Sequence, residues 1–219
     1  MKTLYGIGTG PGASDLLTIR AVEKMKEADV IFVPNNKGKN MALDTAEEYL
    51  EGKKIVYLDF PMGQVTDKHY KDGAEEIYKK IEKNSSGAFL TIGDPMIYST
   101  FIYLAQELEA KEDLKIEVVP GIPSFVASAG AAKLQLTEKS DNFVLCDEPS
   151  QEILDLADSV AILKTFKNKE ETLELLEKNN FSYKYIRRAS LEEEAILEDK
   201  QEILEEKDYI SLILARKDK

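Results

Sequence analysis

Short apolar segments alternate with amphipathic segments as far as Lys133, and this alternation limits the folds open to the chain. The segments expected to form strands are residues 3–9, 30–33, 54–58, 88–92 and 116–119. Helical spacing of apolar residues marks the stretches between them, of which the clearest are a helix from an N-cap at Ser14 to Ala28 and helices at 41–50 and 69–83. Such alternation predicts a mainly parallel sheet flanked by helices.

The pattern changes after Glu138, where the expected strands become shorter. They lie at residues 143–146, 160–163, 183–188, 195–198 and 209–214. Only two clear helices, near 150–156 and 169–179, interrupt them. We therefore expect two α/β domains: an N-terminal domain over residues 1–136 with a mainly parallel sheet, and a smaller C-terminal domain over 137–219 with a mixed sheet.

The charge of the chain restricts its partners. A formal net charge of −12 opposes binding to nucleic-acid phosphates or to an anionic membrane surface, because both depend on clustered Lys and Arg. No apolar run is long enough to span a bilayer. We expect no nucleic-acid partner, no membrane partner and a cytoplasmic location.

Cys146 and His69 are the only residues of their kinds. Zinc sites and Ser-His-Asp or Cys-His centres draw on His and Cys, so these counts argue against them, and we expect no metal held by the protein itself. Cys146 is expected to be a small strand residue, and His69 a solvated residue near a helix start.

Residues 6–13 form a glycine-rich loop directly after the first expected strand. Gly8, Gly10 and Ala13 fit the pattern G-x-G-x-x-A of dinucleotide-binding loops. Two features argue against a nicotinamide cofactor: Pro11 lacks the N–H that would cradle a pyrophosphate, and no acid follows the second strand. A glycine turn that serves only the fold stays open as an alternative.

Two further loops, at 91–100 and 119–125, also follow expected strands. In the first of them, Asp94 is suited to accept hydrogen bonds from a ligand ammonium or hydroxyl group, although an Asp here could instead cap a helix. Ligands of open α/β sheets bind beyond the carboxyl ends of the strands. We therefore expect all three loops to border one cleft.

These loops carry the residues of a known family. The segments Gly8-Thr9-Gly10-Pro11-Gly12, Gly93-Asp94-Pro95 and Pro120-Gly121-Ile122 resemble, in order, the tetrapyrrole (corrin and porphyrin) methylases. Within that family, residues 93–100, 120–125 and 162–164 most resemble the precorrin-2 C20-methyltransferases. Other members more often have glycine where Ser99 stands. The resemblance covers nearly the whole chain.

The resemblance implies a homodimer that methylates carbon 20 of precorrin-2 or its cobalt form, with S-adenosylmethionine folded between the two domains and S-adenosylhomocysteine as product. It also implies cofactor-binding positions, namely Thr9, Pro11, Ile92, Gly93, Asp94, Ile97, Pro123, Ser124 and Leu163. Several members carry methionine in place of Leu163 and serine or threonine in place of Pro123. No role is assigned to residues 141–149.

Methyl transfer from a sulfonium needs positioning and a dry pocket more than a nucleophile, which agrees with a chain that has no evident triad. Tyr98 is a candidate acceptor for the departing proton, although we expect its ring to lie in the core. Lys164 is a candidate contact for a substrate carboxylate or the cofactor. Other possible basic contacts are Arg20, Lys37, Lys39, Lys133, Lys167, Arg187 and Arg188.

Three alternatives remain open at the level of the sequence. The first is a methyltransferase of the same fold that acts on a later corrin intermediate, uroporphyrinogen III, a diphthamide precursor or ribosomal RNA. The second is a nicotinamide oxidoreductase, and the third is a nucleotide-binding module without catalysis. The residues also leave open whether the tetrapyrrole substrate already contains cobalt.

Overall fold

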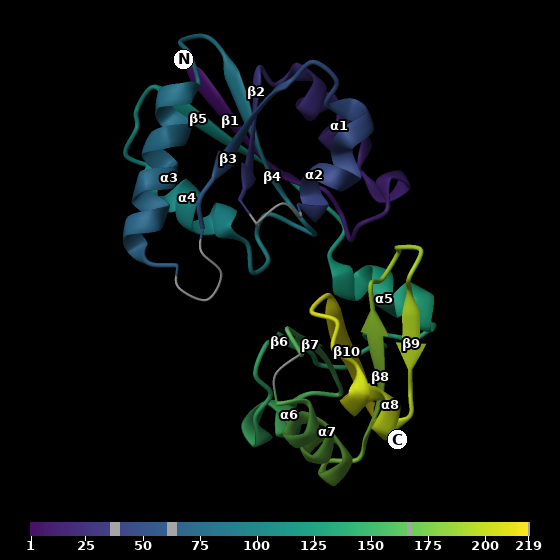
Figure 1. Cartoon of the computed structure of the whole chain (residues 1–219). Helices are drawn as coiled ribbons and strands as arrows, with labels where there is room; N and C mark the ends of the chain where they lie inside the picture. The colour runs from purple at the N-terminus through teal and green to yellow at the C-terminus, as the bar shows by residue number, and fades with distance from the viewer. Residues whose placement is uncertain (36–39, 61–64, 166–167, 219) are drawn as a thin grey trace. The chain divides into compact units, whose positions relative to one another are not determined.

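The computed structural model describes residues 1–35, 40–60, 65–165 and 168–218. The chain divides into two compact units, Met1–Pro123 and Ser124–Lys219, and each unit contains one sheet (Figure 1). The predicted fold class of two α/β domains is confirmed. The division comes earlier than the expected residue 136, because helix α5 (Ser124–Ala132) packs on strands of the second unit.

The sheet of the first unit is parallel throughout its five strands. The strands are β1 (Lys2–Gly8), β2 (Val30–Pro34), β3 (Lys54–Leu58), β4 (Ser86–Thr91) and β5 (Leu114–Val119). Their order in the sheet is β3-β2-β4-β1-β5. Strands β4, β1 and β5 are therefore neighbours, and their carboxyl ends meet at one edge of the sheet.

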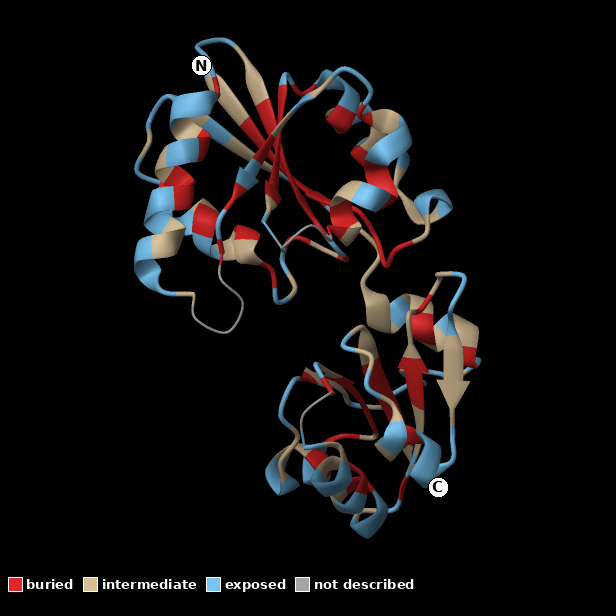
Figure 2. Cartoon of the chain, in the orientation of Figure 1, coloured by how far each residue is buried: buried red, intermediate tan, exposed pale blue. Residues whose placement is uncertain are grey.

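Helices cover both faces of this sheet (Figure 1). They are α1 (Ile19–Glu27) and α2 (Met41–Ala46) on one face, and α3 (Asp67–Lys80) and α4 (Thr100–Leu108) on the other. Side chains alternate between the faces along each strand: Phe32 packs with the α3 and α4 residues, whereas Ile31 packs with those of α1 and α2. The buried residues therefore lie on both sides of the sheet, as Figure 2 shows.

The second unit has a mixed sheet of order β6-β7-β10-β8-β9. Its strands are β6 (Phe143–Cys146), β7 (Ser159–Leu163), β8 (Phe181–Arg187), β9 (Ala195–Leu197) and β10 (Ser211–Lys217). Only β6 and β7 pair in parallel. Helices α6 (Gln151–Leu156), α7 (Lys169–Lys178) and α8 (Lys200–Glu205) cover one face, and α5 packs against residues of the other.

Some expected element boundaries are wrong. Helix α1 begins after Thr18, whose hydroxyl accepts the Ala21 N–H at 3.1 Å, while Ser14–Leu16 forms a separate 3₁₀ turn. The helix expected over 41–50 ends at Ala46 and continues as a 3₁₀ turn, Glu47–Tyr49. Helix α8 was not expected at all.

Cys146 lies buried at the end of β6, as expected, and burial raises the pKa of its thiol to about 11. His69 lies in the first turn of α3, where its Nδ1 accepts the Thr66 N–H at 3.1 Å. None of the helices described is long and apolar enough to cross a membrane. The described His, Cys, Asp and Glu residues form no cluster of three or more suited to hold a metal ion.

Candidate functional site

The three loops singled out in the sequence follow β1, β4 and β5, the three adjacent strands of the first sheet. Gly10 and Gly93 form a short bridge between the first two loops: the Gly93 N–H donates to the Gly10 carbonyl at 2.7 Å, and the Gly10 N–H donates to the Gly93 carbonyl at 3.2 Å. The first two loops thus meet at the carboxyl edge of the sheet.

The third loop approaches so closely that side chains are excluded at the crossing. A Cβ on Gly8 would lie 2.5 Å from the Gly93 carbonyl oxygen and 2.6 Å from the Gly121 nitrogen. A Cβ on Gly121 would lie 2.1 Å from the same Gly93 oxygen. Since these contacts are with backbone atoms, they cannot be relieved by a rotamer change, and glycine is required for the three loops to meet.

Asp94 joins the second loop to the third. Its Oδ1 accepts the Met96 N–H at 2.8 Å, and its Oδ2 accepts the Gly121 N–H at 3.1 Å. The alternative that Asp94 caps a helix is wrong, because the N-cap of α4 is Ser99. The carboxylate is half-buried and can accept further hydrogen bonds, since an ionised carboxylate offers about four acceptor positions.

A set of buried hydroxyl groups links the first loop to the start of α4. Thr9, which is fully buried, donates its N–H at 2.8 Å and its hydroxyl at 3.2 Å to the Thr91 carbonyl. The Ser99 hydroxyl donates to the Thr91 hydroxyl at 3.1 Å and accepts the Phe101 N–H at 3.1 Å. Sequence reasoning gave Thr91 and Ser99 no role, although a serine directly before an apolar helical run is an N-cap signal.

Three large apolar side chains of the second loop are exposed. Ile92, Met96 and Tyr98 expose 41%, 54% and 49% of their surface. The core position expected for Tyr98 is therefore wrong. Its backbone is left-handed, with φ of +46°, a conformation that costs a non-glycine residue free energy and so places the ring where regular backbone would not.

The remaining predicted cofactor positions lie at several places in the fold. Pro11 is buried in the first loop, and Ile97 is half-buried in the second. Pro123 is the last residue of the first unit, and its Cα lies 4.0 Å from where a Cβ of Gly93 would stand. In the second unit, Ser124 begins α5 and Leu163 ends β7, where it packs against the buried residues of that sheet.

Lys164 follows β7 in a left-handed conformation, with φ of +58°. Its Nζ lies 3.7 Å from a carboxylate oxygen of Asp147, and both side chains are about half exposed. Asp147 comes from the stretch after β6 that the sequence left without a role. Lys164 is thus exposed enough to meet a ligand, but its charge already has an acidic neighbour.

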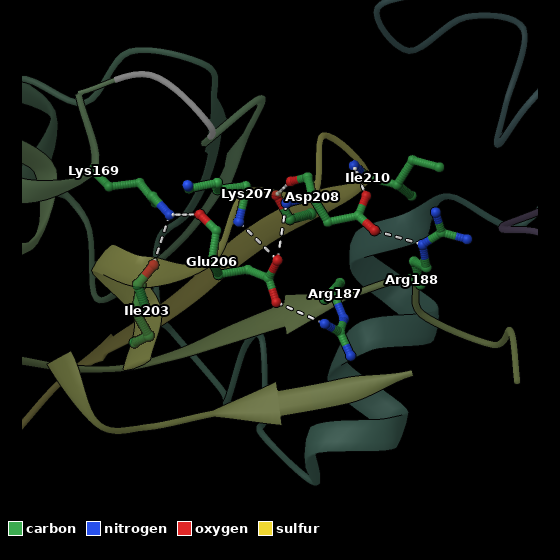
Figure 3. A network of polar contacts seen from close by, with 9 residues as sticks. Lys169, Arg187, Arg188, Ile203, Glu206, Lys207, Asp208 and Ile210 are labelled. Carbon is green, nitrogen blue, oxygen red and sulfur yellow. Dashed lines mark hydrogen bonds and ion pairs between the residues drawn. The ribbon is translucent and has the colours of Figure 1, made fainter. Parts of the chain in front are cut away.

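Arg187 and Arg188 are engaged within the second unit (Figure 3). Arg187 binds a Glu206 carboxylate oxygen at 2.7 Å, and Arg188 binds Asp208 at 2.5 Å. The pKa of Glu206 is lowered, chiefly by the Asp208 N–H that its carboxylate accepts. These two arginines therefore stabilise the segment before β10, and a substrate carboxylate would have to displace an existing partner.

Lys169 belongs to the same network, and sequence reasoning did not single it out. Its ammonium group donates to the Ile203 carbonyl at 2.6 Å and to the Glu206 carbonyl (Figure 3). Burial lowers its pKa.

Among the other basic candidates, Arg20 and Lys133 are exposed, and Lys37, Lys39 and Lys167 lie outside the described residues.

A family model described as Tetrapyrrole (Corrin/Porphyrin) Methylases matches residues 3–204. A Methanocaldococcus jannaschii protein named probable cobalt-precorrin-2 C(20)-methyltransferase is 33% identical over 99% of this chain and 97% of its own length. The cobalt-precorrin-2 C(20)-methyltransferase of Salmonella typhimurium is 33% identical over 74% of this chain and 73% of its own length.

Among solved structures, the fold is similar to that of a uroporphyrin-III C-methyl transferase from Thermus thermophilus complexed with S-adenyl homocysteine. The TM-score is 0.72 over 98% of this chain and 97% of the other, at 19% sequence identity. At this identity the similarity concerns the fold, and it extends over both units.

Proposed function

Because the chain belongs to the tetrapyrrole (corrin/porphyrin) methylase family, we propose that it transfers a methyl group from S-adenosylmethionine to carbon 20 of precorrin-2 or its cobalt form, in cobalamin biosynthesis. The observation that carries the proposal is the similarity, over almost the full length of both chains, to a relative with that name. The meeting of the three family loops at one edge of the first sheet supports it.

The second loop has the groups that S-adenosylmethionine requires. Asp94 keeps acceptor capacity for the cofactor ammonium beyond the two N–H groups that it already binds. Gly93, with φ of +71°, holds the left-handed turn that leads into Asp94, and the exposed Ile92 offers an apolar contact. Thr9, Pro11, Ile97 and Pro123 complete the expected contacts in the first unit.

The mechanism requires the chain to orient two ligands and exclude water. When bound, the cofactor supplies an electrophilic methyl group for an in-line displacement in which the carbon–sulfur bond breaks as the new carbon–carbon bond forms. Asp94 and Gly93 hold one partner, and the other must be held so that its meso carbon lies in line. Tyr98, exposed within the second loop, stays our candidate to accept the proton that leaves that carbon.

An anaerobic assay with methyl-labelled S-adenosylmethionine tests the proposal. Precorrin-2 and its cobalt form are supplied separately, with uroporphyrinogen III and later corrin intermediates as further arms, and the product is analysed by mass spectrometry and NMR. We expect the label at carbon 20 of one precorrin-2 form. Label at another carbon, or only on another tetrapyrrole, would establish the alternative of a same-fold enzyme with a different substrate.

Lys164 is proposed to contact a substrate carboxylate or the cofactor. Replacing it with alanine should raise the tetrapyrrole KM about threefold to tenfold, since one charge-assisted contact is lost. Lys184→Ala is the matched control, because Lys184 also pairs with an acid, Glu198, at 2.7 Å. Unchanged KM and kcat in Lys164→Ala would remove this residue from the proposal.

Ser124 and Leu163 of the second unit are proposed as further cofactor contacts, and the homodimer and the cytoplasmic location are carried forward as proposals. Titration of S-adenosylhomocysteine into Leu163→Ala tests the cofactor contact. Light scattering of the purified protein tests the homodimer, and cell fractionation tests the location.

A further inference from the structure

The second loop is held at its two ends by separate sets of hydrogen bonds. Its first end, Gly93-Asp94, is tied to Gly10 and Gly121 through backbone N–H groups. Its second end, Ser99, is tied to Thr91 through a side-chain hydroxyl. Since the two sets share no atoms, one end can be loosened without breaking the bonds of the other.

Ser99 is well placed to fix the second end. Only 5% of its surface is exposed, and its hydroxyl both donates to Thr91 and accepts the Phe101 N–H. Thr91 is in turn bound to Thr9 through its carbonyl. Buried hydrogen bonds of this kind hold geometry firmly, because breaking one leaves a polar group without water or a partner.

The residues between the two fixed ends include the exposed Met96 and Tyr98. Tyr98 directly precedes Ser99 and has the left-handed φ of +46°. A strained residue persists only where its neighbours determine its conformation, and the bonds of Ser99 supply that constraint. Aromatic rings and thioethers bind flat conjugated surfaces, and a tetrapyrrole presents such a surface.

We propose that Ser99 is a positioning residue: through its hydrogen bond to Thr91, it holds Tyr98 for contact with the tetrapyrrole, while the Gly93-Asp94 end of the loop serves the cofactor. The inference rests on the proposed function and adds a division of labour within one loop. It assigns substrate contact to Tyr98 and a supporting role to Thr91.

Separate measurements with the two ligands test whether the two ends of the loop serve different ligands. In Ser99→Ala and in Thr91→Val, we expect kcat/KM for the tetrapyrrole to fall about fivefold to tenfold, while the Kd for S-adenosylhomocysteine, measured by calorimetry, changes less than about twofold. The double variant should be no worse than the more impaired single variant, because both remove the same bond. Thr91→Ser keeps the hydroxyl and should retain activity.

Two further variants guard against a purely structural explanation. Ser159→Ala removes a buried hydroxyl, as Ser99→Ala does, but this one donates to the Leu136 backbone carbonyl in the second unit, and its loss should leave both constants unchanged. Tyr98→Ala alters an exposed side chain, so it is expected to fold, and it should lower kcat/KM at least as much as Ser99→Ala does.

The inference is overturned if wild-type protein methylates the tetrapyrrole and Ser99→Ala and Tyr98→Ala do so equally well. It is also overturned if Ser99→Ala weakens S-adenosylhomocysteine binding as much as it lowers kcat/KM, since the loop would then act as one unit. Absence of transfer by the wild-type protein to every tetrapyrrole would overturn the proposed function and this inference together.

Discussion

Asp94 shows how one side chain can organise two loops that lie 27 residues apart in the sequence. Replacing it with alanine should leave the Met96 and Gly121 N–H groups without their acceptor and weaken binding of S-adenosylhomocysteine at least about tenfold. Asp94→Asn keeps one carbonyl acceptor, so its affinity for S-adenosylhomocysteine should lie between that of the wild type and that of Asp94→Ala. Calorimetric titration measures this, with Asp113→Ala as the control, because Asp113 accepts a hydrogen bond from Tyr78 at the opposite end of the sheet. Equal affinity of all three variants for S-adenosylhomocysteine would contradict a role for the Asp94 carboxylate in binding it.

Asp29 offers a residue-level test of stability against pH. The Ser85 hydroxyl, and then the Ser86 N–H, lower the pKa of this carboxyl below its ordinary 3.8. A lowered pKa in the folded state contributes stability that is present above the ordinary pKa and is lost as pH falls through the folded value. The free energy of unfolding of wild-type protein should therefore decrease more steeply below about pH 4 than that of Asp29→Asn. Urea titrations from pH 6 to pH 3 measure the free energy of unfolding of both proteins. The same pH dependence in wild type and Asp29→Asn would show that Asp29 does not contribute in this way.

At the scale of elements, the strands of the first sheet were predictable because each is a short apolar run that ends in glycine or proline punctuation. The start of α1 was not, because Ser14 and Thr18 are both suitable N-caps and only the extended Leu17 between them decides in favour of Thr18. Helices α6 and α8 both have six residues and one buried side chain, so neither is long enough to show a period. Helix α8 escaped prediction because its N-cap, Asp199, stands among the charged residues Glu198, Lys200 and Glu202 and is less evident than Ser150 before α6.

The sequence allowed us to predict that the three loops lie at one edge of the sheet, but not which hydrogen bonds hold them together. Parallel strand order brings the ends of β1, β4 and β5 together, so three loops after these strands must be neighbours once the order is known. Which side chains hold them depends on distances of a few tenths of an ångström. The Asp94–Gly121 and Ser99–Thr91 hydrogen bonds are of this kind, and neither residue pair has a periodic relation in the sequence.

Substitution by alanine should have opposite effects at Gly121, where the three loops meet, and at Gly130, within helix α5. Gly121→Ala would place a Cβ 2.1 Å from the Gly93 oxygen, so the third loop must move, and we expect loss of measurable methyl transfer. Gly130 is exposed in α5 with nothing within 4 Å of its would-be Cβ, and Gly130→Ala should stabilise the protein by about 0.5–1 kcal/mol. The methyl-transfer assay measures the first outcome, and thermal unfolding of Gly130→Ala measures the second. A Gly130→Ala variant that melts below wild type would show that the position is not ordinary helix.

At the scale of the whole molecule, the net charge of −12 sets the conditions under which a polycarboxylate substrate can approach. Three of the basic candidates, Lys164, Arg187 and Arg188, already have acidic neighbours in the second unit. The long-range interaction is therefore repulsive, and salt screens it over a Debye length of about 10 Å at 0.1 M. We expect kcat/KM for the tetrapyrrole to rise about twofold to fivefold between 20 and 200 mM salt.

Binding of S-adenosylhomocysteine is the internal control for this salt dependence, because a zwitterionic ligand without net charge should bind with nearly the same Kd at both salt concentrations. Initial rates at low tetrapyrrole concentration report kcat/KM directly. A fall in kcat/KM with salt would mean that a local basic surface outweighs the net charge. Charge reversals at exposed Arg20 and Lys133, neither of which forms an ion pair within the described part of the chain, would then identify which unit provides it.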